Sequence, residues 1–440
     1  MSPEGPTNPY EPPKLAAEKG GAAVLRSPGA ILALLTLLNF VNYLDRFLVT
    51  AVAPKIQDDL RLSNAKIGLI TSAFMIGYFL TSPAFGWFGD RYRRKGLIAA
   101  GVAVWSIATV ASGLVAGFGT MVIARVFVGI GEASYASLAP TIIDDIAPAE
   151  KKNRYLAIFY LATPVGSALG FILGGLLEHR YGWRNAFFVA GGPGVLLALA
   201  TLLIREPERR RVVSEKAAAS PFRVLAGRRL YVLAVGGYIA QTFALGGFVA
   251  WAPQYLTRAL GMELHAADFW LGAVAVATGF AGTAVGGYWA DHMKGDRVIA
   301  CLKICALSSA LSAPFAALCL VMRTPTTFFV AAALCELSLF LSVAPTNAAI
   351  MASVPVWVRA SAMAVSIFAI HLLGDLISPP LIGVIADAGG GGGDGIRLGM
   401  YLTPAAFAVS AVVWIIGAYA ILLGIIYVIF GLKLRKHAPA

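Results

Sequence analysis

The chain has 440 residues, of which 58% are hydrophobic and 13% are charged. Soluble domains are about 45–50% apolar and about 25% charged, so this composition excludes an ordinary soluble enzyme and a disordered protein. The net charge of +12 is typical of a membrane protein whose basic residues gather on its cytoplasmic side, and we do not interpret it as a sign of nucleic-acid binding.

Twelve apolar segments follow one another along the chain, each long enough for a membrane-spanning helix of about 20 residues. Their connections are short except between the sixth and seventh segments, where residues 205–229 are polar. We interpret that stretch as a cytoplasmic linker, with a short amphipathic piece, Pro221–Leu225, on the membrane surface. The apolar segments centre near Leu38, Tyr78, Ser106, Gly129, Gly166, Leu196, Thr242, Gly279, Ser312, Phe340, Leu372 and Gly417.

Lys and Arg residues are distributed unevenly between the two sides of this predicted topology. With the N-terminus inside, 25 of the 35 basic residues lie in inside segments and 8 in outside loops. Because basic residues accumulate on the cytoplasmic side, this bias predicts that both termini are cytoplasmic. An even number of spans agrees with that prediction.

Two similar loops follow the second and the eighth segments. Both contain Gly-x-x-x-Asp, at Gly86–Asp90 and at Gly287–Asp291, with an offset of 201 residues between the aspartates. Internal duplication around a central linker is typical of secondary transporters. We predict that these loops lock the cytoplasmic face without touching the substrate. The residues assigned to this lock are Gly86, Asp90, Arg91, Arg94 and Asp291.

Four ionisable residues fall inside the first and fourth segments: Asp45, Arg46, Arg125 and Glu132. Such residues are costly in a membrane, which makes each a functional hypothesis. The rise per residue places Asp45 and Arg125 in the outer half of the membrane, where they could form a buried ion pair. Arg125 and Glu132 are two helical turns apart and share a face. The alternative is a fixed salt bridge that only orders the bundle.

Glycines lie between Arg125 and Glu132 on the fourth segment. Gly129 and Gly131 leave room beside this face for a ligand or for a neighbouring helix.

The second half of the chain holds three further ionisable residues in predicted spans. Glu336 lies 204 residues after Glu132, close to the repeat offset. His371 and Asp375 are four residues apart and should face the same way. Glu336 and Asp375 have no obvious partner and serve as secondary candidates, whereas His371 is either a site residue or a packing histidine.

Few other residues suggest chemistry. We interpret Cys301, Cys305, Cys319 and Cys335 as small buried hydrophobes, and the glycine run 389–393 as a flexible link in the last outside loop. No Gly-Lys-Ser or Gly-Lys-Thr occurs, so no Walker A site is predicted. Without a metal cluster or a nucleophile–base pair, we expect no enzymatic activity, no cofactor, no metal and no nucleic-acid partner.

Several of these motifs resemble those of the major facilitator superfamily. They are the loop Gly86–Lys95, its copy Gly287–His292, and Arg125-x-x-x-Gly129-x-Gly131-Glu132-Ala133. The stretch Pro164–Gly175 loosely resembles the antiporter motif of that superfamily but departs from it in detail, which leaves exchange and symport open. The resemblance implies an all-α transporter of two six-helix bundles with a central cavity open to each side in turn. The implied organisation is a cytoplasmic tail at 1–28, bundles at 29–204 and 230–430, the linker at 205–229 and a cytoplasmic tail at 431–440.

Within that superfamily the chain resembles the spinster family in a bacterial form. The resemblance covers about Ala30 to Phe430, and its motifs are Asn42–Arg46, Gly131–Tyr135, Trp183–Phe188 and His371–Pro379. It implies an amphiphilic anionic lipid as substrate, such as a lysolipid or sphingosine-1-phosphate, with proton coupling. We also expect a monomer among the lipids of a bacterial inner membrane. A small organic anion, such as a sugar acid or an aromatic acid, is the alternative cargo.

Substrate and proton binding are expected to be linked through the charged residues. Arg46 or Arg125 would hold the anionic head, because a guanidinium binds two phosphate oxygens at once. Asp45 would be the gate partner of Arg125, and Glu132 would carry the proton. Burial favours the neutral form of a carboxyl and a nearby Arg opposes this, so an Arg that moves to the substrate would leave Glu132 to take up a proton.

Overall fold

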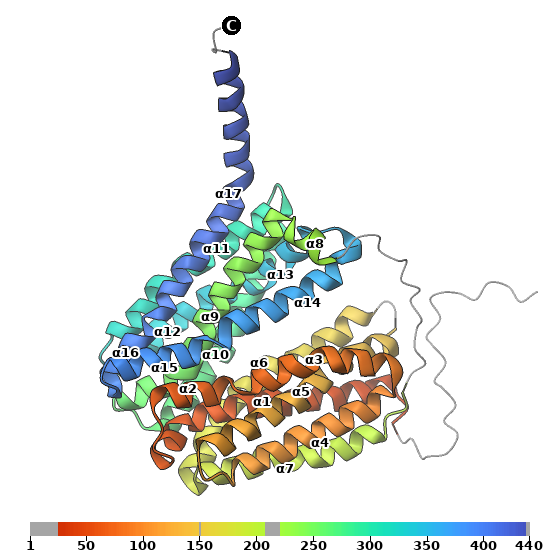
Figure 1. Ribbon diagram of the computed structural model, residues 1–440, viewed down its shortest axis with the longest axis vertical. Coiled ribbons are helices and arrows are strands. Elements are labelled where there is room, and N and C mark those ends of the chain that lie inside the picture. The colour runs from red at the N-terminus through yellow and green to blue at the C-terminus, as the bar shows by residue number, and fades with distance from the viewer. Residues whose placement is uncertain (1–24, 149–150, 207–220, 437–440) are drawn as a thin grey trace, which may run out of the picture. The chain divides into compact units, whose positions relative to one another are not determined.

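The computed structural model describes residues 25–148, 151–206 and 221–436, and helices make up most of these ranges (Figure 1). Twelve helical segments in them are long and apolar enough to cross a membrane. This confirms the all-α prediction and its twelve spans. The structure divides into two compact units. One unit holds α1 to α7 together with Met262–Ala273, and the other holds α8, α9 and the chain from Val274 onward. Residues 1–24 of the first predicted tail, 437–440 of the second and 207–220 of the linker lie outside the described residues.

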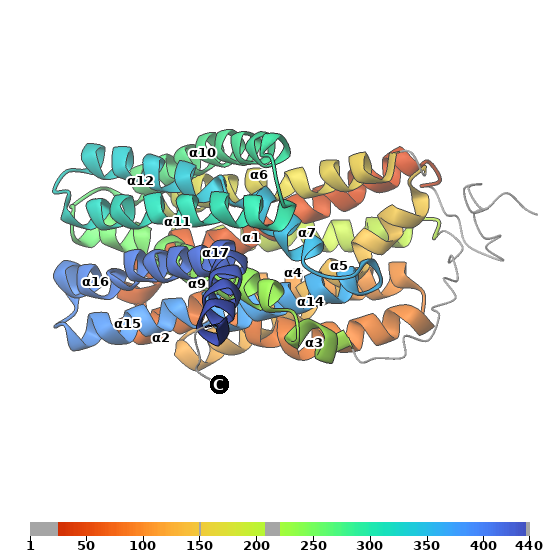
Figure 2. The ribbon, with the colours of Figure 1, turned by 90° about the horizontal axis from the view of Figure 1, so that it is seen from above.

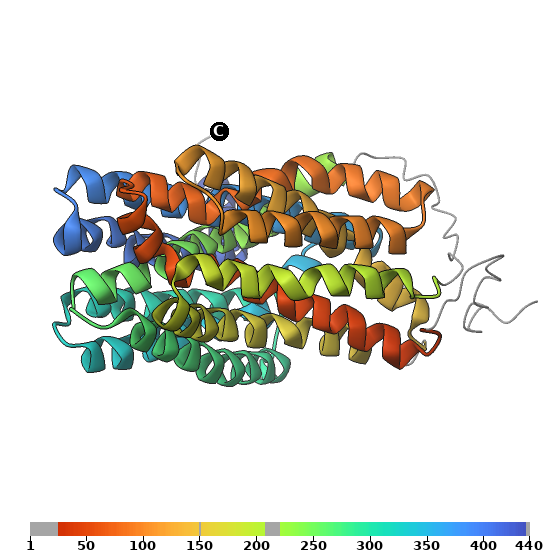
Figure 3. The ribbon, with the colours of Figure 1, turned by 90° about the horizontal axis from the view of Figure 1, so that it is seen from below.

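The first unit contains the first six spans. Its second span is made of two helices that meet at Ala73, and each of the others is one helix. Helices α4 and α7 pack side by side, which Figures 1 and 3 show from two directions. The helices are α1 (Pro28–Asp59), α2 (Asn64–Ser72), α3 (Phe74–Arg91), α4 (Arg94–Ser112), α5 (Phe118–Ile146), α6 (Lys152–Tyr181) and α7 (Trp183–Leu202).

The second unit contains most of the remaining spans, and Figure 2 shows α11 against α12 and α17. The predicted amphipathic piece of the linker forms the short helix α8. The helices are α8 (Pro221–Ala226), α9 (Arg229–Arg258), α10 (Leu264–His292), α11 (Arg297–Val321), α12 (Pro325–Phe340), α13 (Val343–Ala352), the 3-10 turn η2 (Val356–Val358), α14 (Arg359–Ile370), the π-helical turn η3 (His371–Asp375), α15 (Ser378–Ala388), α16 (Gly392–Met400) and α17 (Leu402–Lys436).

The same pairs of spans pack together in both units. The third span contacts the sixth through α4 and α7, as the ninth contacts the twelfth through α11 and α17. The third and fourth spans meet through α4 and α5, as the ninth and tenth do through α11 and α12. This repeated packing agrees with the internal duplication that the two Gly-x-x-x-Asp loops indicate.

Local sequence explains where several helices begin. Ser27 caps α1 by accepting a hydrogen bond from the Ala30 backbone N–H, and Pro28 follows at the first helical position. Thr324 and Pro325 begin α12 in the same way. A hydroxyl oxygen accepts a hydrogen bond from one of the free N–H groups at a helix start. Proline is tolerated there because an N–H at that position would have no partner within the helix.

Three spans of the second unit are interrupted, and each interruption precedes a proline. The break between α12 and α13 lies before Pro345, that between α16 and α17 before Pro404, and η3 before Pro379 and Pro380. Proline cannot donate to the carbonyl four residues earlier and clashes with it. The helix therefore opens one turn before the proline, which places His371 and Asp375 on a wider π turn.

The glycine run after α15 forms a defined turn, which corrects the expectation of a flexible link. Gly390, Gly391 and Gly392 have φ angles of +89°, +69° and +60°, which residues with a Cβ rarely adopt. The Gly391 N–H donates to the Ala386 carbonyl, and the Gly389 N–H to the Ile385 carbonyl. These bonds close the end of α15 and reverse the chain into α16.

Candidate functional site

A salt bridge between α1 and α5 lies in the interior of the first unit. The Arg46 Nη2 donates to the Glu132 Oε2 at 2.6 Å. The Glu132 side chain is 1% exposed, whereas that of Arg46 is 17% exposed and so remains partly accessible. This ion pair satisfies one oxygen of a carboxylate that is costly in a membrane, whereas the Glu132 Oε1 has no hydrogen-bond partner in the described part of the chain.

Asp45 contacts a different helix from the one predicted. Its Oδ2 accepts a hydrogen bond of 2.6 Å from the Thr109 hydroxyl of α4, and its side chain is buried. Thr109 was missed by the sequence analysis. Its signal is a row of small polar residues at three-residue spacing, Ser106, Thr109 and Ser112, all with 0% exposure.

Arg125 is buried with its guanidinium unpaired. The residue is 0% exposed, and none of its three side-chain nitrogens has a hydrogen-bond partner in the described part of the chain. The expected ion pair between Asp45 and Arg125 is therefore not hydrogen-bonded, although the two charges interact electrostatically. Glu132, expected beside Arg125, is bonded to Arg46 instead.

Helix geometry explains this exchange of partners. Adjacent residues of an α-helix point about 100° apart, so Asp45 and Arg46 cannot both face α5. The longer Arg46 side chain reaches Glu132, and Asp45 turns toward α4.

One aromatic ring lies close to both arginines. The guanidinium carbon of Arg46 is 4.6 Å from the centroid of the Phe74 ring and 5.0 Å from that of Tyr43. The corresponding distance from Arg125 to Phe74 is 5.7 Å. A ring face attracts cations, so Phe74 helps to hold both guanidinium groups in place.

Gly129 and Gly131 of α5 allow the backbones of two neighbouring helices to approach closely. A Cβ on Gly129 would lie 1.7 Å from the Phe74 backbone oxygen of α3, and one on Gly131 would lie 2.4 Å from the Gly101 oxygen of α4. The glycines were expected to leave room for a ligand or for a neighbouring helix, and in the structure neighbouring helices occupy that room. Gly129 thereby brings Phe74 close to the arginines.

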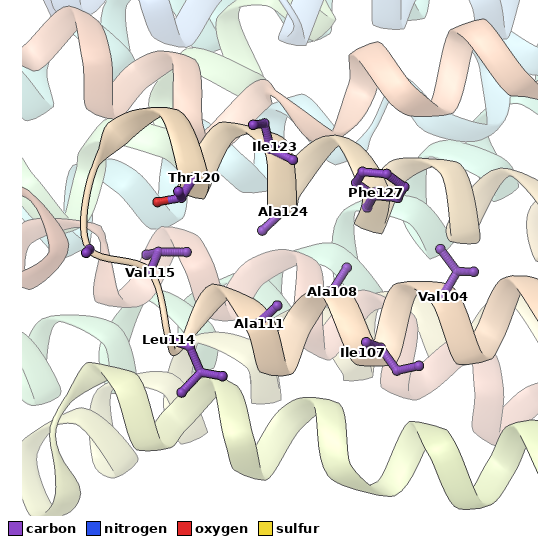
Figure 4. Close-up of a pocket in the computed structure, with 11 residues that line it drawn as sticks. Val104, Ile107, Ala108, Ala111, Leu114, Val115, Thr120, Ile123, Ala124 and Phe127 are labelled. Carbon is purple, nitrogen blue, oxygen red and sulfur yellow. The ribbon is translucent and has the colours of Figure 1, made fainter.

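An open apolar groove runs between α4 and α5 next to this site. Its volume is about 640 Å³, and Ala108, Ala111 and Ala124 face it from the two helices (Figure 4). Ala108 and Ala124 directly precede Thr109 and Arg125, so the groove passes the level of the charged residues. Its walls consist almost wholly of hydrocarbon: Val104, Ile107, Ala108, Ala111, Leu114, Val115, Ala116, Thr120, Ile123, Ala124 and Phe127.

In the second unit the secondary candidates have partners, contrary to the expectation that they lack them. The Thr278 hydroxyl donates to the Glu336 Oε2 at 3.0 Å. The His371 Nδ1 lies 2.9 Å from the Asp375 Oδ2 on η3, so these two residues face the same way as predicted. π turns often mark functional positions in helices.

The predicted lock residues differ in their surroundings. Arg94 is buried and its guanidinium contacts Asp145 at 2.6 Å, Glu206 at 3.2 Å and Thr141 at 3.0 Å. Arg94 therefore joins the start of α4 to α5 and to the chain after α7.

The other members of the predicted lock make fewer contacts. Arg91 stacks on Trp87, and a Cβ on Gly86 would have nothing within 4 Å. Asp291 is exposed and lies 3.7 Å from Arg297. Asp90 lies in α3, and its side chain is outside the described part.

The four cysteines are buried and free, and the Cys305 thiol lies 3.3 Å from the Thr346 hydroxyl. No group of three or more His, Cys, Asp or Glu side chains suited to a metal ion occurs in residues 25–148, 151–206 and 221–436.

Comparison with known proteins adds to this geometry. Residues 35–379 match the Major Facilitator Superfamily. Protein spinster homolog 1 of Homo sapiens is 34% identical over 399 residues, covering 82% of this chain and 74% of the human protein. The sphingosine-1-phosphate transporter of Danio rerio is 33% identical, covering 84% of this chain and 79% of its own length.

Solved structures share the fold. The crystal structure of a bacterial homolog to the human lysosomal transporter Spinster, inward-facing and unoccupied, has a TM-score of 0.81 at 22% sequence identity. The similarity covers 90% of this chain and 98% of that one.

Proposed function

This chain belongs to the spinster family of the major facilitator superfamily, and on that premise we propose that it is a secondary active transporter of an anionic, amphiphilic lipid. A lysolipid or a sphingolipid such as sphingosine-1-phosphate has the required chemistry, and the names of the relatives support this class. The chain is an integral membrane protein. We further propose that it works as a monomer in a bacterial inner membrane, without a cofactor and without enzymatic activity.

The observation that carries this proposal is the pair of arginines in the first unit. Arg125 has no hydrogen-bond partner in the described part of the chain, and Arg46 is partly exposed and held by a single carboxylate. A planar guanidinium binds a phosphate or carboxylate through two parallel bonds. Two such groups around one buried ring would provide the positive charge that an anionic head requires.

The apolar groove supports an amphiphile over a small acid. A lipid tail is stabilised by about 0.8 kcal/mol for each CH₂ removed from water. The groove between α4 and α5 lies at the level of the arginines and is lined almost entirely by hydrocarbon. A small organic anion would use the arginines alone.

Proton coupling follows in this proposal from the Arg46–Glu132 bond. A substrate phosphate that takes Arg46 away would leave Glu132 buried without its partner. Because a lone buried carboxylate is costly, Glu132 would then take up a proton. Substrate binding and proton binding would be linked without direct contact between them.

Transport by reconstituted protein tests the substrate class. We expect proteoliposomes to move fluorescent lysolipids under a pH gradient, and to leave gluconate and benzoate in place. Movement of the small acids with no movement of any lysolipid would establish the organic-anion alternative. The phosphate-free analogue of each active lipid is the matched control, because it keeps the tail and removes the group that binds arginine.

Replacement of Glu132 tests the coupling. Glutamine mimics the protonated carboxyl and can still accept a bond from Arg46, so Glu132→Gln should abolish proton-driven accumulation and retain exchange of substrate between the two sides. Arg125→Ala should lose both activities. Glu263→Gln, the same exchange at an exposed residue, should behave as wild type. If Glu132→Gln concentrates substrate as wild type does, Glu132 is not the coupling residue.

A further inference from the structure

A buried carboxyl lies near the start of α10, away from the arginines. Asp268 is 0% exposed, and neither of its oxygens has a hydrogen-bond partner in the described ranges. An ionised carboxylate in such a place carries the full cost of its lost hydration, because no donor replaces the water. The proton-coupling scheme around Glu132 makes no use of this residue.

Asp268 is buried by a very close approach of α6. A Cβ on Gly175 would lie 2.7 Å from the Asp268 Oδ2 and 2.9 Å from its Cβ. Another Cβ, on Gly272 one turn further along α10, would lie 2.7 Å from the Ala168 carbonyl oxygen. Residues 262–273 belong to the same compact unit as α6. Two glycines therefore create this contact, and Asp268 is enclosed by it.

The charged neighbours of Asp268 do not compensate a negative charge. Glu178 of α6 interacts electrostatically with Asp268, and it is itself paired with Lys55 of α1 at 3.7 Å. The rings of His179 and His265 stack with their centroids 4.4 Å apart. A second carboxylate nearby cannot balance a negative charge on Asp268.

We propose that Asp268 is a proton-binding site that controls the contact between α6 and the first turns of α10. With a proton bound, Asp268 is neutral and the two helices pack at Gly175. Loss of the proton places a charge in this contact, and the helices separate to hydrate it. The site differs from the arginine site in location and needs no substrate.

The direction of the pH effect follows from which form holds the proton. The packed form binds one more proton than the separated form, so a rise in pH favours separation. One linked proton changes the ratio of the two forms by up to about tenfold per pH unit.

Spin labels can measure this contact directly. Arg180 and Glu263 are exposed at the adjoining ends of the two helices, and each would be replaced by a labelled cysteine in a chain whose four buried cysteines are alanine. In nanodiscs, the short-distance population should fall as pH rises from about 5 to about 9. This range spans the titration of carboxyl and imidazole groups. A distance distribution that does not change with pH would overturn the proposal.

Two variants should move the distribution in opposite directions. Asp268→Asn keeps the shape and removes the charge, so the short distance should persist at every pH. Gly175→Ala inserts a Cβ into the contact, so the long distance should dominate at every pH. Asp394→Asn alters a carboxylate whose side chain is 91% exposed and should titrate as wild type does.

The proposal fails if Asp268→Asn retains the wild-type pH response. Failure here would leave the lysolipid transport assay unaffected, because the measurement involves no substrate.

Discussion

Two neighbouring side chains of α1 form hydrogen bonds with different helices. Asp45 is bonded to Thr109 of α4, and Arg46 is bonded to Glu132 of α5. Arg125 is near both carboxylates but hydrogen-bonded to neither. Counted as formal charges, the two acids and the two bases of this site cancel.

The Thr109 hydroxyl should contribute measurably to stability. Thr109→Val keeps the shape of the side chain and removes the only donor observed for Asp45 within the described residues. A buried acceptor left unsatisfied costs about 1–3 kcal/mol. The apparent melting temperature in nanodiscs should fall for Thr109→Val and remain near wild type for Thr109→Ser. Equal melting of the two variants would show that the bond contributes nothing.

At the scale of helices, close contacts through glycine determine which side chains meet. Gly129 allows the backbone of α3 to approach α5 at Phe74, and Gly175 does the same for α6 and α10. A membrane offers no hydrophobic force between helices, so close packing of small residues is a main source of their association.

Gly129→Ala should separate α3 from α5. Its Cβ would lie 1.7 Å from a backbone oxygen, which cannot rotate away as a side chain can. Overpacking typically costs about 1–3 kcal/mol. We expect a lower melting temperature and weaker lysolipid transport, because Phe74 moves with α3. Gly192→Ala provides the control, since a Cβ there would have nothing within 4 Å. Equal behaviour of the two alanine variants would contradict the assignment.

At the scale of the whole molecule, the two units repeat the same pairs of packed spans but do not repeat the ionisable residues within those spans. The first unit holds Asp45, Arg46, Arg125 and Glu132, whereas the second holds Glu336 and the His371–Asp375 pair. Among the described residues, the duplicated architecture therefore carries a site with one buried and one partly buried arginine in the first unit only. This asymmetry is expected of a transporter in which one unit binds the anionic head.

Ligand binding should stabilise the folded protein as a whole. A ligand that binds only the folded state adds about 2.7 kcal/mol at one hundred times its dissociation constant. Lysophospholipids should therefore raise the melting temperature in nanodiscs, and gluconate should not. Nanodiscs avoid detergent, which is itself an amphiphile and competes. The reverse order of the two ligands would favour the organic-anion function.

The sequence by itself determined the spans, their number and the residues that are costly in a membrane. Hydrophobic length and intrachain hydrogen bonding are local properties, so twelve spans could be counted before any packing was known. The same reasoning singled out Asp45, Arg46, Arg125 and Glu132, because each is an ionisable group in an apolar segment. It could have added Asp268 on the same ground, as the fifth residue of α10.

Only the tertiary structure decided the partners of these residues. Depth along a helix suggested Asp45 with Arg125, but a pair also needs the right direction around the helix axis, and one-residue steps turn that direction by about 100°. The rotation of a helix about its axis is set by its contacts with other helices, such as that of α5 with α3 at Gly129 and that of α10 with α6 at Gly175. Those contacts join residues far apart in the chain, and no local pattern encodes them.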